Sequence, residues 1–239
     1  MSSEIDPGDH SGEKDGGKMP TERFLKLKEE KKRRILDAAF REFSRVPFRE
    51  ASINRIIKDA DISRGSFYTY FEDKTDLLRI LLRDGSKSLT EVLTQELEKS
   101  GGDYFRALDD TFSWFLEMLS KEDNLAVSFI RNTLCNEEVF RDATGLNLAG
   151  KGENPAAHPF FRDFMQLCEE ITEKLDRERY PVTVEKMASL FPMSVMIIVK
   201  TAADCIEHPA AEPLLRKQLE MMLDIMKNGV YRREARTAV

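Results

Sequence analysis

The sequence contains few of the residues that build disulfide frameworks, metal sites and catalytic centres. Its 239 residues include three cysteines, three histidines and one tryptophan. Cys135, Cys168 and Cys205 form no CxxC pair, so neither a disulfide framework nor a zinc site is expected. No HExxH pattern and no paired acid–base residue accompany the histidines. We therefore predict that the protein is not an enzyme and that it holds no metal and no cofactor.

Long apolar runs and a leader sequence are also lacking. The longest uncharged apolar run covers residues 190–199 and ends at Lys200, whereas a membrane-spanning helix needs about 20 apolar residues. Residues 1–20 lack the basic start, apolar middle and small-residue cleavage site of a secretory signal. The sequence therefore predicts a cytoplasmic protein with no membrane partner.

The chain carries a net charge of −6, which by itself argues against a nucleic-acid partner. The charge is unevenly distributed, however. Residues 1–21 carry −3, residues 22–83 carry sixteen basic against eleven acidic side chains, or +5, and residues 84–239 carry −8. A basic block followed by an acidic block indicates two units with different partners.

Apolar residues recur at intervals of three and four from residue 21 onward, with no strand pattern and no internal repeat. We predict an all-α fold. Its domains are a disordered tail (1–20), a basic "head" (21–83) and a helical "body" (84–239). Helices are expected at 22–44, 53–60, 64–70, from 74 onward, and at 104–119, 122–135, 160–180, 183–207 and 212–231. We expect residues 136–159, the least regular segment, to form a long loop with a short helical piece.

Two short helices joined by about four residues form the pattern of a helix-turn-helix in the head. Ser63 is expected to cap the second helix, whose first turn reads bases in such motifs. Arg64 reaches outward and can bond guanine in a bidentate manner, while Gly65 and Ser66 permit a close backbone approach. Hydroxyl and ammonium groups that suit phosphate oxygens follow on the side expected to be exposed, at Tyr68, Thr69, Tyr70 and Lys74.

These residues resemble the DNA-binding domain of the TetR family of bacterial transcriptional regulators. The resemblance covers residues 35–78. It is carried by the stretch ASINRIIKDADISRGSFYTYFEDKTDLL at 51–78, in which an aromatic-x-aromatic-Phe run is followed closely by Lys74. One departure is Val46-Pro47-Phe48, which replaces a Gly-aromatic pair common before the first helix of the motif.

The resemblance implies a role for each matching residue. Ser52 and Asn54 correspond to positions that touch phosphate and, in some members, a base. The base-reading turn corresponds to Arg64, Gly65 and Ser66. Further phosphate contacts correspond to Tyr68, Tyr70 and Lys74.

The resemblance also implies an assembly and a mode of control. The expected protein is a homodimer that binds a palindromic operator in double-stranded DNA. The C-terminal helices within residues 183–231 are expected to pack as a four-helix bundle between two subunits. A small-molecule effector in the body would control the spacing of the heads through the helix that starts at Lys74, and so release a repressor from its operator.

Large aromatic and methionine side chains in the body are candidates for the lining of an apolar effector cavity. They are Phe112, Phe115, Met118, Phe129, Phe164 and Met165, with Trp114 and Phe161 beside them. The alternative for each is an ordinary place in the hydrophobic core. The apolar stripes within 183–231 could likewise belong to the core of one subunit instead of a dimer interface.

Two other functions remain open from the sequence. An enzyme would use a cavity in the body and keep the head as a remnant, although nucleophile–base pairs and phosphate-binding glycine loops are lacking. A protein-interaction module would use the helix-turn-helix to bind a partner protein instead of DNA. A redox-sensing role for Cys135 is also open.

Overall fold

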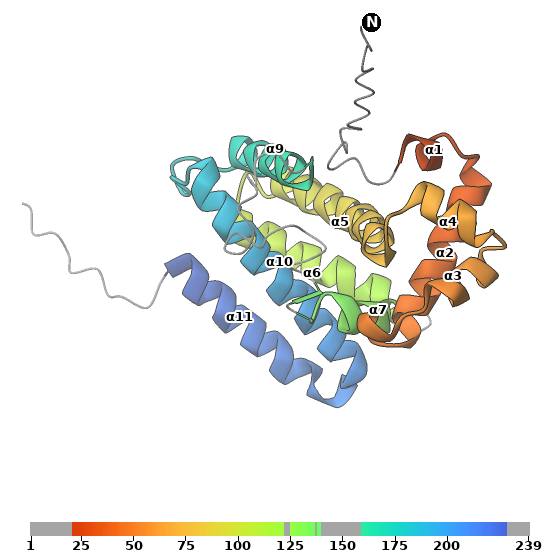
Figure 1. The fold of residues 1–239 in the computed structure, drawn as a ribbon. Helices are drawn as coiled ribbons and strands as arrows, with labels where there is room; N and C mark the ends of the chain where they lie inside the picture. The colour runs from red at the N-terminus through yellow and green to blue at the C-terminus, as the bar shows by residue number, and fades with distance from the viewer. Residues whose placement is uncertain (1–20, 122–124, 137, 140–158, 229–239) are drawn as a thin grey trace, which may run out of the picture.

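The computed structural model describes residues 21–121, 125–136, 138–139 and 159–228, and every element in these ranges is a helix (Figure 1). The predicted all-α fold is therefore confirmed. The tail predicted at 1–20 and most of the loop predicted at 136–159 lie outside the described residues.

The head contains α1 (Glu22–Leu25), α2 (Glu29–Arg45), the 3-10 helix η1 (Phe48–Glu50), α3 (Ile53–Asp59) and α4 (Arg64–Tyr70). The single helix predicted over 22–44 is divided, because Lys28 adopts an extended conformation between α1 and α2. The break turns the chain so that Phe24 packs against Phe71, with ring centroids 4.8 Å apart. The helices predicted at 53–60 and 64–70 are confirmed to within one residue.

Aromatic and branched side chains fill the centre of the head. Ile35 from α2, Ile56 from α3 and Phe67 from α4 have no exposed surface. Burial of a side chain of this size contributes about 1.5–3 kcal/mol. Phe43 packs against Phe48 with centroids 5.1 Å apart. Although Val46-Pro47-Phe48 departs from the Gly-aromatic pair, its aromatic residue Phe48 still lies in the core.

A single helix, α5 (Lys74–Lys99), connects the head to the body. Asp73 caps it as predicted, because the Asp73 Oδ1 accepts the Thr75 N–H at 2.7 Å. Near the start of α5, Leu77 and Leu78 belong to the core of the head. Further along, Leu93 and Leu97 belong to the core of the body. One continuous helix is thus part of both units.

The end of α5 is fixed by two glycines. Gly101 and Gly102 have φ angles of 67° and 86°, a region that side chains with a Cβ rarely adopt. A Cβ on Gly102 would lie 2.2 Å from the Asp176 backbone nitrogen. The Asp176 N–H donates to the Gly102 carbonyl at 3.1 Å. This close approach pins the end of α5 to the segment that follows α9.

The rest of the body consists of α6 (Tyr104–Lys121), α7 (Leu125–Thr133), α9 (Pro159–Lys174), α10 (Val184–Glu207), η3 (Pro209–Ala211) and α11 (Glu212–Asn228). The helices predicted at 104–119, 183–207 and 212–231 are confirmed apart from their ends. The helix predicted at 160–180 ends earlier, because the Asp176 side chain accepts the N–H groups of Glu178 and Arg179 in a turn.

Helix α10 lies at the centre of the body, where it packs against α6, α9 and α11 (Figure 1). It is long and apolar enough to cross a bilayer by length and composition. However, Met187, Ile198 and Ala202 are buried among the other helices. A core helix of a helical bundle has the same composition.

Candidate nucleic-acid interface and effector cavity

The helix-turn-helix predicted in the head is present as α3, residues 60–63 and α4. Asp61 adopts a left-handed conformation with φ 52°, which lets the chain reverse between the two helices. The Ser63 Oγ accepts the Ser66 N–H at 3.0 Å, which confirms Ser63 as the cap of α4. Because Phe67 is fully buried below, the first turn of α4 presents Arg64 and Gly65 outward.

Arg64 is held in place before any DNA is bound. Its Nη1 donates to the Asn54 Oδ1 at 3.0 Å. Its Cζ lies 5.6 Å from the centroid of the Tyr68 ring, a cation–π distance. Asn54 and Tyr68, which the resemblance implies are DNA contacts, therefore also restrict the rotamers of the predicted base reader. All three side chains are exposed.

The expectation that Tyr70 lies on the exposed side of α4 is wrong for its ring. Tyr70 is 9% exposed, and its ring centroid lies 6.2 Å from that of Phe24. The reason is helical geometry, since Tyr70 follows the buried Phe67 by three residues and shares its face. Thr69 is half-buried and donates its hydroxyl to the Gly65 carbonyl at 2.9 Å.

Lys74 has its ammonium engaged inside the head. Its Nζ donates to the carbonyl oxygens of Phe48, Arg49 and Ala51 at 2.7, 2.9 and 3.0 Å. These three bonds use all the donors of an ammonium group. Burial also lowers the Lys74 pKa. Lys74 therefore fixes η1 to the start of α5, and a direct phosphate contact requires it to exchange one of these bonds.

Glu42 is a residue that the sequence analysis missed. It is buried on α2, where its carboxylate accepts the Ser52 N–H at 2.7 Å and the Arg55 Nε at 2.9 Å, and also pairs with Arg45. Ser52 occupies the N-cap position of α3 but makes no capping bond with its own side chain. Glu42 instead accepts the N–H of the N-cap residue itself, which ties the start of α3 to α2.

Hydrogen bonding keeps the Glu42 carboxylate charged. Burial raises its pKa, but the hydrogen bonds from Arg55, Arg45 and the Ser52 N–H outweigh burial and lower the pKa from 4.5 to about 2. One signal in the sequence pointed to this residue. Glu42 follows Ala38 by four positions and so falls on the apolar face of its helix.

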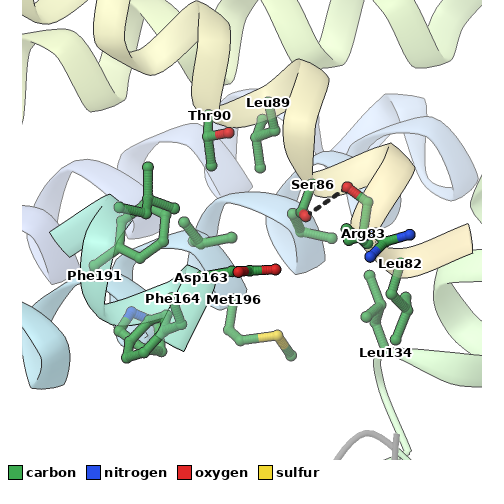
Figure 2. A pocket seen from close by; sticks show the side chains of 14 residues that line it. Leu82, Arg83, Ser86, Leu89, Thr90, Leu134, Asp163, Phe164, Phe191 and Met196 are labelled. Carbon is green, nitrogen blue, oxygen red and sulfur yellow. Dashed lines mark hydrogen bonds between the residues drawn. The ribbon is translucent and has the colours of Figure 1, made fainter. Parts of the chain in front are cut away.

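Two adjoining apolar cavities lie in the body, with volumes of about 190 and 250 Å³. They share lining residues from α5, α10 and the end of α7, namely Leu82, Ser86, Leu89, Leu134, Val195 and Val199. Figure 2 shows the first cavity, where Arg83 and Asp163 are the charged groups among mainly apolar side chains. An occupant would therefore be mostly apolar.

Four of the six predicted effector residues line these cavities. Phe164 lines the first, and Phe115, Met118 and Phe129 line the second, together with Trp114. Two predicted residues line neither cavity. Phe112 is fully buried and faces α11, where the Arg216 Cζ lies 5.1 Å from its ring centroid. Met165 is the helical neighbour of Phe164, about 100° away around α9. The side chain of Phe161 lies outside the described residues.

The second cavity adjoins the core of the head. Phe129 lines this cavity and is also buried in the head cluster, where its ring centroid is 5.0 Å from that of Phe40. One turn later, the Asn132 Nδ2 donates to the carbonyl oxygens of Phe43 and Ser44 at 3.0 and 2.9 Å. Helix α7 therefore ties the cavity to α2, in addition to the continuous α5.

Comparison with known proteins places the head in a family. Residues 35–81 match the family model described as "Bacterial regulatory proteins, tetR family". The match covers most of α2, all of α3 and α4, and the start of α5, and so includes Arg64. The head therefore matches the TetR family over residues 35–81.

The curated proteins that part of this chain resembles are transcriptional regulators. The chain is 30% identical over 95 residues to the HTH-type transcriptional regulator AcrR of Shigella flexneri. The aligned region covers 40% of this chain and 44% of AcrR. The alignment therefore spans less than half of that curated relative.

Two solved structures share the fold over most of the chain. FadR from Bacillus halodurans, a fatty acid degradation regulator, aligns with a TM-score of 0.53 and 15% identity over 87% of this chain and 100% of that one. FadR from Bacillus subtilis in complex with stearoyl-CoA aligns with a TM-score of 0.50 and 16% identity over 83% and 99%. At this identity the likeness concerns the fold.

The thiols of the body are held in their neutral form. Burial raises the pKa of Cys135 and Cys205, and it raises that of Cys168 to about 11. The thiolate is the reactive form of cysteine, so a raised pKa disfavours oxidation. No group of three or more potential metal ligands occurs among the residues that the structure describes.

Proposed function

We propose that the protein is a cytoplasmic DNA-binding transcriptional regulator, in which the head (21–83) reads DNA and the body (84–239) senses an effector and dimerises. The observation that carries this proposal is the placement of Arg64. It stands exposed on the first turn of the second helix of the motif and is oriented by Asn54 and Tyr68. A guanidinium fixed in this way can bond the O6 and N7 of guanine in the major groove.

An exposed apolar surface on α10 and α11 supports a homodimer. Met193 on α10 is 58% exposed, and Leu214 and Ile225 on α11 are 60% and 51% exposed. On the other side of α11, Leu219 and Leu223 are buried in the body. Helix α11 is therefore apolar on two sides, which fits the bundle predicted for residues 183–231, as far as the described residue 228. Two heads would then read the half-sites of a palindromic operator, about 34 Å apart.

The cavities support control by a small apolar effector. Helix α5 lines both cavities through Leu82 and Ser86 and enters the head through Leu78. An effector that binds one position of α5 more tightly than another shifts the population of head spacings and releases a repressor from its operator. Because FadR from Bacillus subtilis was crystallised with stearoyl-CoA, a long-chain acyl compound is the first effector to test.

The DNA-binding function is tested by fluorescence anisotropy with two labelled duplexes, the intergenic DNA next to the protein's own gene and a random sequence. We expect a preference of at least about 10³-fold for the intergenic DNA at physiological salt. Equal affinity for the two duplexes would reject the DNA-binding proposal. A molecular mass of 27.5 kDa in solution, that of a monomer, would reject the proposed dimer.

Effector binding has an internal reporter. Trp114, the one tryptophan of the chain, lines the second cavity. We expect an acyl compound to change Trp114 fluorescence and to weaken binding to the intergenic duplex at the same concentrations. A fluorescence change without any change in DNA affinity would reject the regulatory link but retain the cavity as a ligand site.

A further inference from the structure

The two ends of α4 meet different parts of the head. Its first turn lines a shallow surface groove of about 340 Å³ together with Ser52, Lys74 and Tyr68. Its last turn contacts α1. The Thr21 Oγ1 donates to the Thr69 carbonyl at 3.0 Å, and the Thr21 N–H donates to the Tyr70 carbonyl at 3.2 Å. Helix α1 is therefore fixed to the C-terminal end of the reading helix.

These contacts change the electrostatics of that end. The carbonyl groups at a helix C-terminus carry a partial negative charge of about half an elementary charge, which repels phosphate. Helix α4 has no basic residue in its last turn. Instead, Thr21 donates two hydrogen bonds to its last carbonyls, and the Lys31 Nζ lies 5.8 Å from the centroid of the Tyr70 ring. Residues from α1 and α2 thus offset the negative end of α4.

Three basic residues of the segment that is held against this end of α4 have no acidic partner. Arg23 and Lys28 are exposed, and Lys31 is half-buried. Within the described part of the chain, none of the three forms an ion pair with a carboxylate. The lysines beside them differ, because Lys26 and Lys32 are each paired with a glutamate on their own helix. The unpaired charges are therefore available to an external anion.

The geometry of the DNA major groove indicates that this anion is a backbone phosphate. A helix in the major groove, which is about 12 Å wide, lies between two phosphate strands. In the proposed complex, the groove lined by Arg64, Ser52 and Lys74 lies beside one of these strands. We propose that α1 and the first turn of α2 form a second phosphate-binding border, in which Arg23, Lys28 and Lys31 contact the other strand of duplex DNA. This inference rests on the proposed DNA-binding function and extends the contact surface beyond α3, α4 and α5.

The border is tested by the salt dependence of binding to a 40-base-pair random duplex, which requires no knowledge of the operator. The variant carries Arg23→Gln, Lys28→Gln and Lys31→Gln. Each lost phosphate contact lowers the log–log salt slope by about 0.9, so we expect a loss of about 2–3 per head. The control carries Lys87→Gln, Lys99→Gln and Lys121→Gln, which removes the same charge from exposed lysines of α5 and α6.

The outcomes separate the border from the function on which it rests. Wild-type protein that fails to bind either duplex overturns both proposals. Wild-type protein that binds, with equal salt slopes for the two triple variants, overturns the border alone. A slope that falls in the α1–α2 variant and not in the control supports it.

A second measurement needs no variant. Lysines of the full-length wild type are acetylated with a water-soluble ester, with and without the random duplex, and the products are quantified by mass spectrometry. We expect DNA to protect Lys28 and Lys31 several-fold and to leave Lys87 unchanged. Equal modification of Lys28 in both conditions contradicts the border even if the triple variant does not fold.

Discussion

The head and the body use their polar groups and their interior space in opposite ways. In the head, the buried charge of Glu42 and the half-buried charge of Lys74 are matched by partners. Glu42 binds three donor groups, and Lys74 binds three carbonyl oxygens. In the body, two apolar cavities remain between α5, α7 and α10. These arrangements suit the proposed roles, because a DNA reader needs one fixed geometry, whereas an effector sensor needs space that a ligand can fill.

The Glu42 cluster should have the largest effect on stability, because its carboxylate is buried among charged donors. We expect Glu42→Gln to lower the free energy of unfolding by about 2–3 kcal/mol at pH 7. The folded-state pKa is about 2 against an ordinary 4.5. Its contribution is therefore present above pH 4.5 and is lost as the pH falls towards 2.

Urea unfolding followed by circular dichroism at pH 7, 4 and 3 checks this prediction. The gap between wild type and Glu42→Gln should close as the pH falls. The exposed Glu30→Gln serves as the control for loss of a carboxylate. A gap that stays constant with pH would show that Glu42 does not act through its charge.

Matched alanines test the contrast in packing. Ala39 is fully buried in the head, and Ala126 lines the second cavity of the body. Ala39→Leu should lower the free energy of unfolding by about 1–3 kcal/mol, because extra methyl groups overfill a packed core. Ala126→Leu should be neutral or stabilising and should weaken effector binding. Urea titrations of both variants provide the measurement. An equal loss in the free energy of unfolding for the two variants would contradict the difference in packing between head and body.

Base reading should depend on Arg64 more than on its neighbours. We expect Arg64→Ala to cost about 1–3 kcal/mol of binding to the intergenic site and to relax preference at one position of each half-site. Arg64→Lys should keep the affinity for random duplex but not the preference, because lysine cannot bond bidentately. Asn54→Ala should show a weaker form of the Arg64→Ala effect. Binding to a set of single-base operator variants measures all three.

Lys74 distinguishes a structural role from a phosphate contact. Because its three donors are engaged by carbonyl groups, we expect Lys74→Ala to lower the free energy of unfolding by about 1 kcal/mol and to leave the salt slope unchanged. Anisotropy at several salt concentrations, combined with urea unfolding, reports both quantities. A slope that falls by about 0.9 per head would restore the phosphate role that the resemblance implies.

The smallest effect concerns α5. A Cβ on Gly85 meets nothing within 4 Å, so Gly85→Ala should stabilise the helix by about 0.5–1 kcal/mol. It should also reduce the response of DNA binding to the effector if α5 bends there. Gly102→Ala is the opposite control, since its φ is 86° and its Cβ would overlap the Asp176 backbone. The midpoint temperature of thermal unfolding should rise for Gly85→Ala and fall for Gly102→Ala.

The sequence was sufficient where local patterns determine the structure. The period of apolar residues and the capping residues Ser63 and Asp73 predicted the helices and their starts, because both depend on neighbours within one turn. The exposure of Arg64 follows from the same local rules. The break between α1 and α2 could not be predicted, because it depends on contacts of Thr21 and Phe24 with residues about 48 positions away.

Contacts between distant segments explain the other differences. Lys74 was assigned to phosphate because a lysine at a helix start suits an anion, yet its partners are carbonyl groups 23–26 residues earlier. The cavity prediction selected large side chains on α6, α7 and α9 and missed the smaller Val195 and Val199 of α10. Residue size indicates which side chains can fill space, whereas the position of a void depends on how several helices pack.

The length of α5 has a mechanical consequence. At about 1.5 Å per residue, the segment of α5 from Lys74, at the head, to Leu89, which lines both cavities, is a lever arm of about 22 Å. A tilt of about 10° at the cavity end moves the head by about 4 Å. In a dimer the two displacements add, and half-sites about 34 Å apart tolerate little such change. In the proposed dimer, a small rotation of α5 is therefore amplified into a displacement of both heads relative to DNA.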